Sequence, residues 1–153
     1  MKDFKFLRAE KEWQRAGAYS VRVEGMNRAH HIPLEEEFDE HDGEGTRYIV
    51  ALDDGYPVGT CRFYQTASDT VTLGRVVVLP EYRGEKLGSR VVKEAEEWIG
   101  ELGYSVIVID SRVSVVPFYE KLGFRRDGSG PEMNSVFECV RMVKKIKTKP
   151  ARG

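Results

Sequence analysis

Apolar and polar residues alternate over several short stretches in the first half of the chain, as they do in strands with one buried face. Two of these stretches flank Asp53-Asp-Gly-Tyr-Pro57, and Asp-Gly between apolar runs is the strongest short-range signal for a hairpin. Apolar residues at helical spacing predict a helix over residues 9–26. Strands are predicted at residues 4–8, 47–52, 58–64 and 70–79. They form the antiparallel half of a sheet.

The second half of the chain has a different pattern. Residues 87–102 carry an apolar stripe at helical spacing, and Gly103 is suited to end that helix. Residues 104–109 lack alternation, which is typical of a strand covered on both faces and reached through a crossover helix. Ser114 is expected to cap a second helix that ends at Gly123. The last strands are predicted at residues 124–127 and 135–145.

This order of elements predicts an α+β fold with a mixed, mostly antiparallel sheet of about seven strands. A chain of 153 residues is long enough for one domain with a core that needs no disulfide or metal. We therefore expect a single domain over residues 1–146, followed by a basic tail at 147–153.

Charge and hydropathy exclude several classes of function. The 24 basic and 25 acidic residues give a formal net charge of −1, which provides no general attraction to nucleic acid or anionic lipid. The hydrophobic fraction is 41%, and the sequence contains no apolar run long enough to cross a membrane and no leader-like start. We expect a cytoplasmic protein, in which any anion site is local.

Histidine and cysteine give no signal for a metal site or a disulfide. Residues 30–42 hold three histidines among carboxylates, but no known ligand spacing is met, and a short helix after Pro33 with a solvated acidic face is expected. Cys61 and Cys139 each stand in a strand-like run and are expected to be buried free thiols.

The most informative stretch is residues 74–89, where an apolar strand passes through a proline turn into a basic, glycine-containing loop that opens a helix. The first N–H groups of a helix lack intrahelical partners and carry the positive end of its dipole, so they suit phosphate. Arg83 and Lys86 add charge, and Ser89 adds a hydroxyl. Neither the P-loop nor the Rossmann glycine pattern is met.

The pattern Val-x-Pro-x-x-Arg-Gly-x-x-x-Gly at residues 78–88, with Phe118-Tyr-Glu-Lys-Leu-Gly-Phe124, resembles the GNAT superfamily of acetyl-CoA-dependent N-acetyltransferases. The resemblance runs from about Arg47 to Phe124. It implies helices on both faces of the sheet, a splayed central strand pair, acetyl-CoA as co-substrate and no metal.

The resemblance also implies where coenzyme A binds. The main chain around Val76 and Val78 would pair with pantetheine, and N–H groups from Gly84 to Ser89 would hold the pyrophosphate. The family has glycine where Lys86 stands, and many relatives have asparagine at the place of Arg112. The implied coenzyme-binding residues are Val76, Val77, Val78, Arg83, Gly84, Glu85, Lys86, Leu87, Gly88, Ser89 and Arg112.

Tyr119 is the candidate catalytic residue. Taken alone, Phe118 and Tyr119 are more readily interpreted as core aromatics, but the resemblance reverses this and implies that Tyr119 protonates the departing thiolate. A phenol with a pKa of about 10 stays protonated at neutral pH and suits a thiolate whose conjugate acid has a pKa near 8.5.

Two functions follow from the resemblance. The first is transfer of acetyl from acetyl-CoA to a primary amine of a small molecule or peptide, by direct attack in a ternary complex. The second is a non-catalytic acyl-CoA-binding module, suggested by the departures at Lys86 and Arg112. A homodimer is compatible with either.

The acceptor side is less defined. Carboxylates between residues 35 and 42 form a candidate negative rim that would attract a cationic amine. The candidates for a general base are Glu24, Glu35, Glu36, Glu37 and His41.

Overall fold

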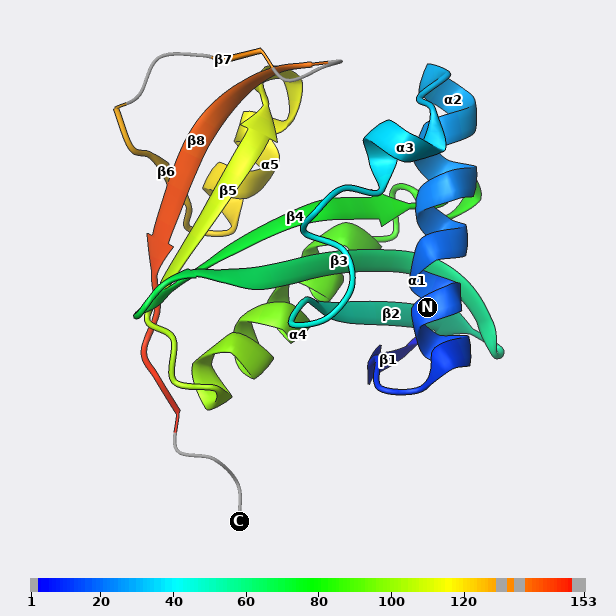
Figure 1. The fold of residues 1–153 in the computed structure, drawn as a ribbon, viewed down its shortest axis with the longest axis horizontal. Helices are drawn as coiled ribbons and strands as arrows, with labels where there is room; N and C mark the ends of the chain where they lie inside the picture. The colour runs from blue at the N-terminus through cyan, green and yellow to red at the C-terminus, as the bar shows by residue number, and fades with distance from the viewer. Residues whose placement is uncertain (1–2, 129–131, 134–136, 150–153) are drawn as a thin grey trace. The chain divides into compact units, whose positions relative to one another are not determined.

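The computed structural model describes residues 3–128, 132–133 and 137–149 (Figure 1). These residues group into two compact units, the first within Met1–Phe63 and Arg75–Ala95 and the second within Tyr64–Gly74 and Glu96–Gly153. Strands β3 (Tyr56–Ala67) and β4 (Thr70–Val78) contribute residues to both units. The single domain over residues 1–146 stays a prediction.

The sheet has the order β1-β2-β3-β4-β5-β8-β6, with β7 paired to β8. Strand β4 is parallel to β5, whereas β1–β2, β2–β3, β5–β8 and β6–β8 are antiparallel. The predicted α+β fold with a mixed, mostly antiparallel sheet is therefore confirmed. The other strands are β1 (Lys5–Arg8), β2 (Arg47–Asp53), β5 (Val106–Arg112), β6 (Arg125–Arg126), β7 (Glu132–Met133) and β8 (Glu138–Lys145).

The helices lie where the apolar spacing predicted them, with shorter turns between. The first helix is continuous from α1 through a π-helical turn into α2. The helices are α1 (Glu12–Arg22), the π turn η1 (Val23–Asn27), α2 (Arg28–His30), α3 (Leu34–Glu37), α4 (Leu87–Glu101) and α5 (Val116–Lys121), and the 3-10 turns are η2 (Pro80–Tyr82) and η3 (Val113–Val115).

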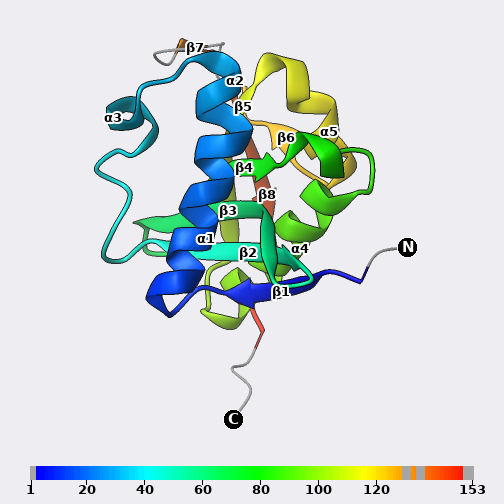
Figure 2. The same ribbon diagram turned by 90° about the vertical axis from the view of Figure 1, so that its right-hand side faces the viewer.

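Within the first unit, α1 and the start of α4 cover opposite faces of β2 and β3 (Figure 2). A Cβ on Gly17 of α1 would lie 3.5 Å from Val50, whereas a Cβ on Gly59 would lie 3.4 Å from Leu87 of α4 and 3.5 Å from Ala51. Val50 and Ala51 are successive residues of one strand, so they point to opposite faces. Both helices pack closely because a glycine lies at each contact.

The first helix differs from its predicted bounds at both ends. It begins at Glu12, three residues later than expected, because the Gln14 side chain accepts a hydrogen bond from the Lys11 N–H at 2.9 Å and caps the helix there. It continues to His30, beyond the predicted end at residue 26. The π turn has more residues per turn than an α-helix, so it shifts the apolar face around the helix axis. Apolar spacing at about 3.6 residues therefore did not predict the residues after the turn as helical.

The second unit also contains corrections. The residue that caps α5 is Val115, without a side-chain hydrogen bond, so the prediction of Ser114 as cap was wrong. Ser114 lies inside the turn η3, because β5 continues to Arg112 instead of ending at residue 109. The first residues predicted for the last strand, 135 and 136, lie outside the described residues.

The start of the predicted tail packs against the second unit. The Lys149 N–H donates to the Gly100 carbonyl at 2.9 Å, and its ammonium pairs with Glu97 at 2.5 Å. The tail is therefore hydrogen-bonded up to Lys149.

Strands β4 and β5 pair over a short length. Their ladder joins residues 70–72 of β4 to residues 106–108 of β5, with Val71 opposite Ile107 at its centre. No further β4–β5 pair occurs among the described residues, so the later part of β4 is outside this ladder. The expected splayed pair of central strands is present.

Candidate active site

The loop between β4 and α4 leaves a run of backbone N–H groups without backbone partners in the part of the chain that the structure describes. The N–H groups of Tyr82 and Arg83 bond to the carbonyls of the preceding turn, and the next bonded one is that of Arg90, which donates to the Lys86 carbonyl at 3.2 Å. Between them, the N–H groups from Gly84 to Ser89 make no backbone hydrogen bond within the described part of the chain. Consecutive free donors at a helix start are suited to an anion.

Tyr82 fixes the beginning of this loop. Its hydroxyl donates to Asp53 Oδ2 at 2.5 Å, and its ring meets the Phe4 ring edge-on with centroids 5.9 Å apart. The hydrogen bond to Asp53, with a smaller contribution from burial, raises the pKa of Tyr82 to about 12. The phenol therefore stays protonated and keeps this bond throughout the neutral range.

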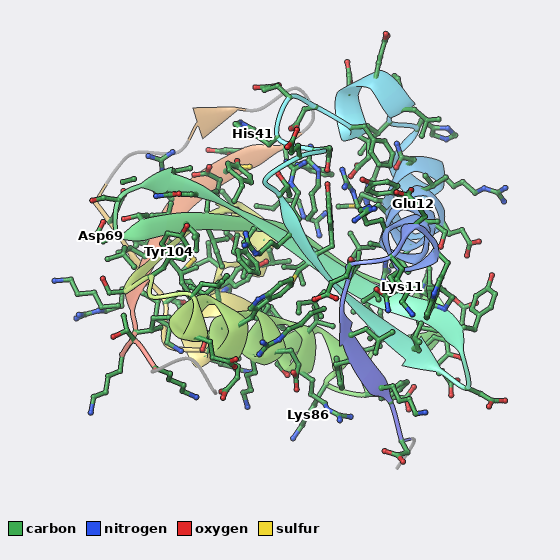
Figure 3. The ribbon with its side chains drawn as sticks, turned by 60° about the horizontal axis from the view of Figure 1, so that its bottom comes forward. Lys11, Glu12, His41, Asp69, Lys86 and Tyr104 are labelled. Carbon is green, nitrogen blue, oxygen red and sulfur yellow. The ribbon has the colours of Figure 1, made fainter. Side chains whose placement is uncertain are left out.

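Two residues of the loop have left-handed backbone. Gly84 has φ 88°, which glycine adopts at no steric cost, and Lys86 has φ 59°. The side chain of Lys86 extends away from the protein near the start of α4 (Figure 3). Lys86 therefore has a backbone conformation that glycine adopts more readily than lysine does.

Ser89 is also placed differently from our expectation. Its hydroxyl donates to the Lys86 carbonyl at 2.9 Å, so that proton is used inside the first turn of α4. The loop therefore presents backbone N–H groups, and the serine contributes by holding the turn.

Lys86→Gly is expected to stabilise the protein by about 0.5–1 kcal/mol, because the left-handed strain on a non-glycine residue slightly exceeds the entropic cost of glycine. Urea unfolding measures the change. Lys93→Gly is the matched control, since Lys93 is an exposed interior residue of α4, and it should destabilise by about 1 kcal/mol. Equal destabilisation by both variants would contradict the assigned backbone conformation.

Strand β4 is closely covered where coenzyme is expected to pair. A Cβ on Gly25, in the π turn, would lie 2.6 Å from Val77 Cγ1 and 3.7 Å from the Val78 carbonyl oxygen. The helix backbone therefore touches β4 at this point, and any larger residue at 25 would displace it. Asn27, in the same turn, is buried, and its Oδ1 has no hydrogen-bond partner among the described residues.

A cluster of three arginines and three carboxylates joins four elements of the first unit. Figure 1 shows the segment from α3 to β2, in cyan, crossing β3 and β4, and the carboxylates lie on it. We name this the arginine–carboxylate cluster, and its members are Arg22, Glu37, Asp39, Asp42, Arg62 and Arg75.

Arg22 is the buried centre of the cluster. Its side chain is fully buried, with Nε 2.9 Å from Glu37 Oε2 and Nη1 2.8 Å from Asp42 Oδ1. The Tyr48 hydroxyl donates to the same Asp42 oxygen at 2.8 Å. Burial alone would raise the pKa of Asp42, but the hydrogen bond and charge of Arg22 outweigh it and hold that pKa well below its usual range.

Arg62 and Arg75 attach the cluster to the sheet. Arg62 of β3 binds Asp39 through two nitrogens, at 3.0 and 3.1 Å, and Asp42 at 2.8 Å. Arg75 of β4 binds Glu37 Oε2 at 3.0 Å and Asp39 Oδ2 at 3.3 Å. Burial alone would raise the pKa of Asp39, but the hydrogen bonds and charge of Arg62, with the charge of Arg75, lower it.

These contacts change the interpretation of the negative rim. Three carboxylates of that segment are neutralised by three arginines, and Glu37 is only 3% exposed. The exposed acidic residues that remain in the segment are Glu35, Glu36 and Glu40. A cation in solution therefore meets a weaker negative charge than the sequence suggested.

Tyr119 and Arg112 belong to the second unit. Tyr119 is 6% exposed in α5, and its ring meets those of Phe118 and Phe124 edge-on with centroids 4.9 and 5.8 Å away. The Arg112 guanidinium lies 4.7 Å from the centre of the Phe137 ring. The catalytic role of Tyr119 and the coenzyme contact of Arg112 stay predictions.

Both cysteines are free thiols, as expected. Cys61 is buried as expected, and burial raises the pKa of its thiol. Cys139 is only half-buried, so the expectation of a buried thiol was wrong there. Among the described residues no group of three or more His, Cys, Asp or Glu is arranged to hold a metal ion. No helix in the described ranges is long and apolar enough to cross a membrane.

Sequence patterns missed the arginines of the cluster. Arg62 stands inside a strand between apolar neighbours and is 4% exposed, and Arg22 ends the buried face of α1. A charged residue at an inward position was the available signal, because charged side chains are almost never fully buried unless paired. The pairing itself joins residues 15 or more positions apart, which local spacing does not encode.

Comparison with known proteins identifies the family. The model of the Acetyltransferase (GNAT) family matches residues 9–124, which is more than half of the chain. The chain belongs to the GNAT acetyltransferase family. The uncharacterised N-acetyltransferase YjcF of Bacillus subtilis is 32% identical over 117 residues, which cover 76% of this chain and 82% of YjcF.

Crystal structures of other GNAT proteins agree in fold. A candidate N-acetyltransferase from Lactobacillus plantarum has a TM-score of 0.86 and 29% identity, covering 93% of this chain and 97% of its own. An aminoglycoside 6′-N-acetyltransferase complexed with coenzyme A has a TM-score of 0.71 and 18% identity, covering 95% and 99%, and that likeness concerns the fold alone. The GNAT protein described here is an acyltransferase.

Proposed function

We propose that this GNAT protein transfers acetyl from acetyl-CoA to a primary amine of a small molecule or peptide, by direct attack in a ternary complex. The observation that carries the proposal is the run of N–H groups from Gly84 to Ser89 that lack a backbone partner among the described residues. This run follows the strand segment Val76–Val78 after the turn η2. The loop would bind the pyrophosphate, and the strand would pair with pantetheine, with Arg83 adding charge. These donors match a bound anion chemically.

The reaction forms one C–N bond and breaks one C–S bond. The lone pair of the neutral amine attacks the thioester carbonyl carbon, the tetrahedral intermediate collapses, and coenzyme A leaves as a thiolate. Tyr119 donates its proton to the thiolate, and the nitrogen releases the proton that it carried to a base or to water. The Tyr119 phenolate then regains a proton from water, which completes the cycle. The products are the N-acetyl amine and the free thiol of coenzyme A.

Before attack, the acceptor ammonium must lose a proton, which costs about 4–5 kcal/mol at pH 7 for a pKa of about 10.4. Glu37 is poorly suited as the base, since one of its oxygens is shared by Arg22 and Arg75. The remaining candidates for the base are Glu24, Glu35, Glu36 and His41.

A thiol-release assay with acetyl-CoA and a panel of primary amines tests this function. Release that depends on the amine, with the N-acetyl product seen by mass spectrometry, is the expected result. Tight binding of acetyl-CoA without amine-dependent release would favour the non-catalytic acyl-CoA-binding module instead.

Gly88→Val is expected to weaken acetyl-CoA binding at least about tenfold, because a β-branched side chain at the second residue of α4 obstructs approach to the loop. Isothermal calorimetry measures the affinity, and a melting curve shows that the fold is kept. Ala16→Val, at an exposed position of α1, introduces the same β-branched residue type and should leave affinity unchanged. Unchanged affinity in Gly88→Val would remove this loop from the coenzyme site.

A further inference from the structure

The proposed coenzyme site has a direction along β4, and the inference below rests on that proposed function. With the pyrophosphate at Gly84–Ser89 and pantetheine along Val76–Val78, the acyl end of the coenzyme points back along the strand. Each strand residue advances about 3.3 Å, so Arg75 is about 10 Å from Val78. Arg75 is therefore the first charged residue of β4 in the direction of the acyl end.

Arg75 differs from the other arginines of the arginine–carboxylate cluster in its exposure. Its side chain is 30% exposed, whereas those of Arg22 and Arg62 are 0% and 4% exposed. It also has φ 51°, a conformation that residues other than glycine rarely adopt and that occurs often at functional sites. The strand is thus irregular at the residue that carries this accessible guanidinium.

The guanidinium of Arg75 retains unused donors. Nε contacts Glu37 Oε2 at 3.0 Å, and Nη2 donates to the Glu37 carbonyl at 3.0 Å and contacts Asp39 Oδ2 at 3.3 Å. Nη1 makes no hydrogen bond to any described residue. Its two N–H groups are available to a ligand, and the carboxylates on the opposite edge hold the guanidinium in place.

The carboxylates of the cluster do not offer an equivalent site for a cation. Both oxygens of Asp39 are bound by Arg62, and one also contacts Arg75. Asp42 is bound by Arg22, Arg62 and Tyr48. Glu37 shares its Oε2 between two arginines and is only 3% exposed, so it is closed to a cation from solution. The partly exposed group of the cluster that lacks a partner among the described residues is therefore Nη1 of Arg75, which is a hydrogen-bond donor. A guanidinium donor favours an anionic group on the ligand.

We propose that Arg75 binds the carboxylate of the acceptor, which makes the acceptor an amine that also carries a carboxylate, such as a free amino acid. Guanidinium matches carboxylate in geometry and charge. Exposed Glu35 and Glu36 would attract the ammonium end of the same molecule and repel a more highly charged anion such as phosphate. Arg75 is on this basis a specificity-determining residue.

The test compares free L-amino acids with their methyl esters in the thiol-release assay, at saturating acetyl-CoA. For each amino acid, kcat/KM for the free acid is divided by kcat/KM for its methyl ester, which gives an acid-to-ester ratio. For at least one amino acid we expect this ratio to be about tenfold or more lower in Arg75→Gly than in the wild type. The amino group of a free amino acid and that of its ester differ in basicity. This difference is the same for both proteins, so it cancels when the ratio of the variant is compared with that of the wild type. Glycine also suits the positive φ at position 75.

Two further variants separate recognition from a purely structural role. Arg75→Lys keeps the charge without the planar fork and should give an intermediate ratio. Asp39→Asn loosens the same ion pair but keeps the guanidinium, so the ratio should stay near that of the wild type. If Arg75→Gly does not fold, the comparison of Arg75→Lys with Asp39→Asn decides.

The outcomes are distinct for the two proposals. In one outcome, the protein acetylates amines that lack a carboxylate, and the acid-to-ester ratio is equal in wild type and Arg75→Gly. This result overturns the role of Arg75 and leaves the acetyltransferase function intact. In another outcome, calorimetry shows no binding of acetyl-CoA, and no amine gives thiol release. This result overturns the proposed function, and the role of Arg75 with it.

Discussion

Tyr119→Phe is expected to lower kcat by about 10²-fold or more while leaving the affinity for acetyl-CoA unchanged, because it removes the proposed proton donor to the thiolate and nothing else. The ring is 6% exposed and lies edge-on to Phe118 and Phe124, and phenylalanine preserves these contacts. Steady-state kinetics at saturating acetyl-CoA and amine measure kcat, and calorimetry measures binding.

Tyr104→Phe is the matched control for Tyr119. Tyr104 lies in the same unit, and its hydroxyl donates to Gln65 Oε1 at 3.1 Å, a contact with no part in the proposed chemistry (Figure 3). Its loss should leave kcat within about twofold, since an exposed hydrogen bond contributes little. If Tyr119→Phe turns over as fast as Tyr104→Phe, Tyr119 is a packing residue and water protonates the thiolate.

Arg22→Met is expected to destabilise the protein by about 3–5 kcal/mol, since it leaves Glu37 and Asp42 buried with one fewer positive partner. Methionine is similar in length and can keep the contact with Phe38, whose ring centre is 4.3 Å from the guanidinium carbon. The free energy of unfolding from urea titration measures the loss.

Arg15→Met is the matched control on the same helix. Arg15 pairs with Glu12, whose side chain is 91% exposed, and such a pair contributes about 0–1 kcal/mol. A loss in Arg22→Met no larger than that in Arg15→Met would show that the buried cluster contributes little to stability.

The pH dependence follows from the direction of the pKa shift. The pKa of Asp42 is lowered in the folded protein, so its contribution to stability is present above the unfolded pKa of about 3.9 and is lost as the pH falls towards the folded pKa. The difference between wild type and Arg22→Met should therefore shrink below about pH 4.

Local patterns predicted the elements well and their ends less well. The Asp-Gly hairpin, the apolar stripe of α4 and the crossover from β4 to β5 are all present. The π turn at Val23–Asn27 and the cap of α5 at Val115 were missed, since each depends on how the chain packs after the element has formed. Element type is encoded locally, but element ends are decided by competing contacts.

The candidate site divides in the same way. The loop with free N–H groups could be predicted because its residues are contiguous, and a helix start needs only its own backbone to offer N–H groups. Its role in coenzyme binding stays a prediction. Arg75 and the arginine–carboxylate cluster were not recognised, because their partners are contributed by four separate elements. In the sequence, the carboxylates of the cluster were interpreted as part of an acidic surface, because the sequence does not show that they pair with arginines.

The sequence by itself determined the fold class, the family and the loop that opens α4, because alternation, helical spacing and contiguous motifs are properties of neighbouring residues. The tertiary structure alone decided that Lys86 has a positive φ and that Glu37 and Asp42 are neutralised. It also decided that Nη1 of Arg75 has no partner within the described ranges. These outcomes depend on distances between residues that are far apart in the chain, and only folding sets those distances.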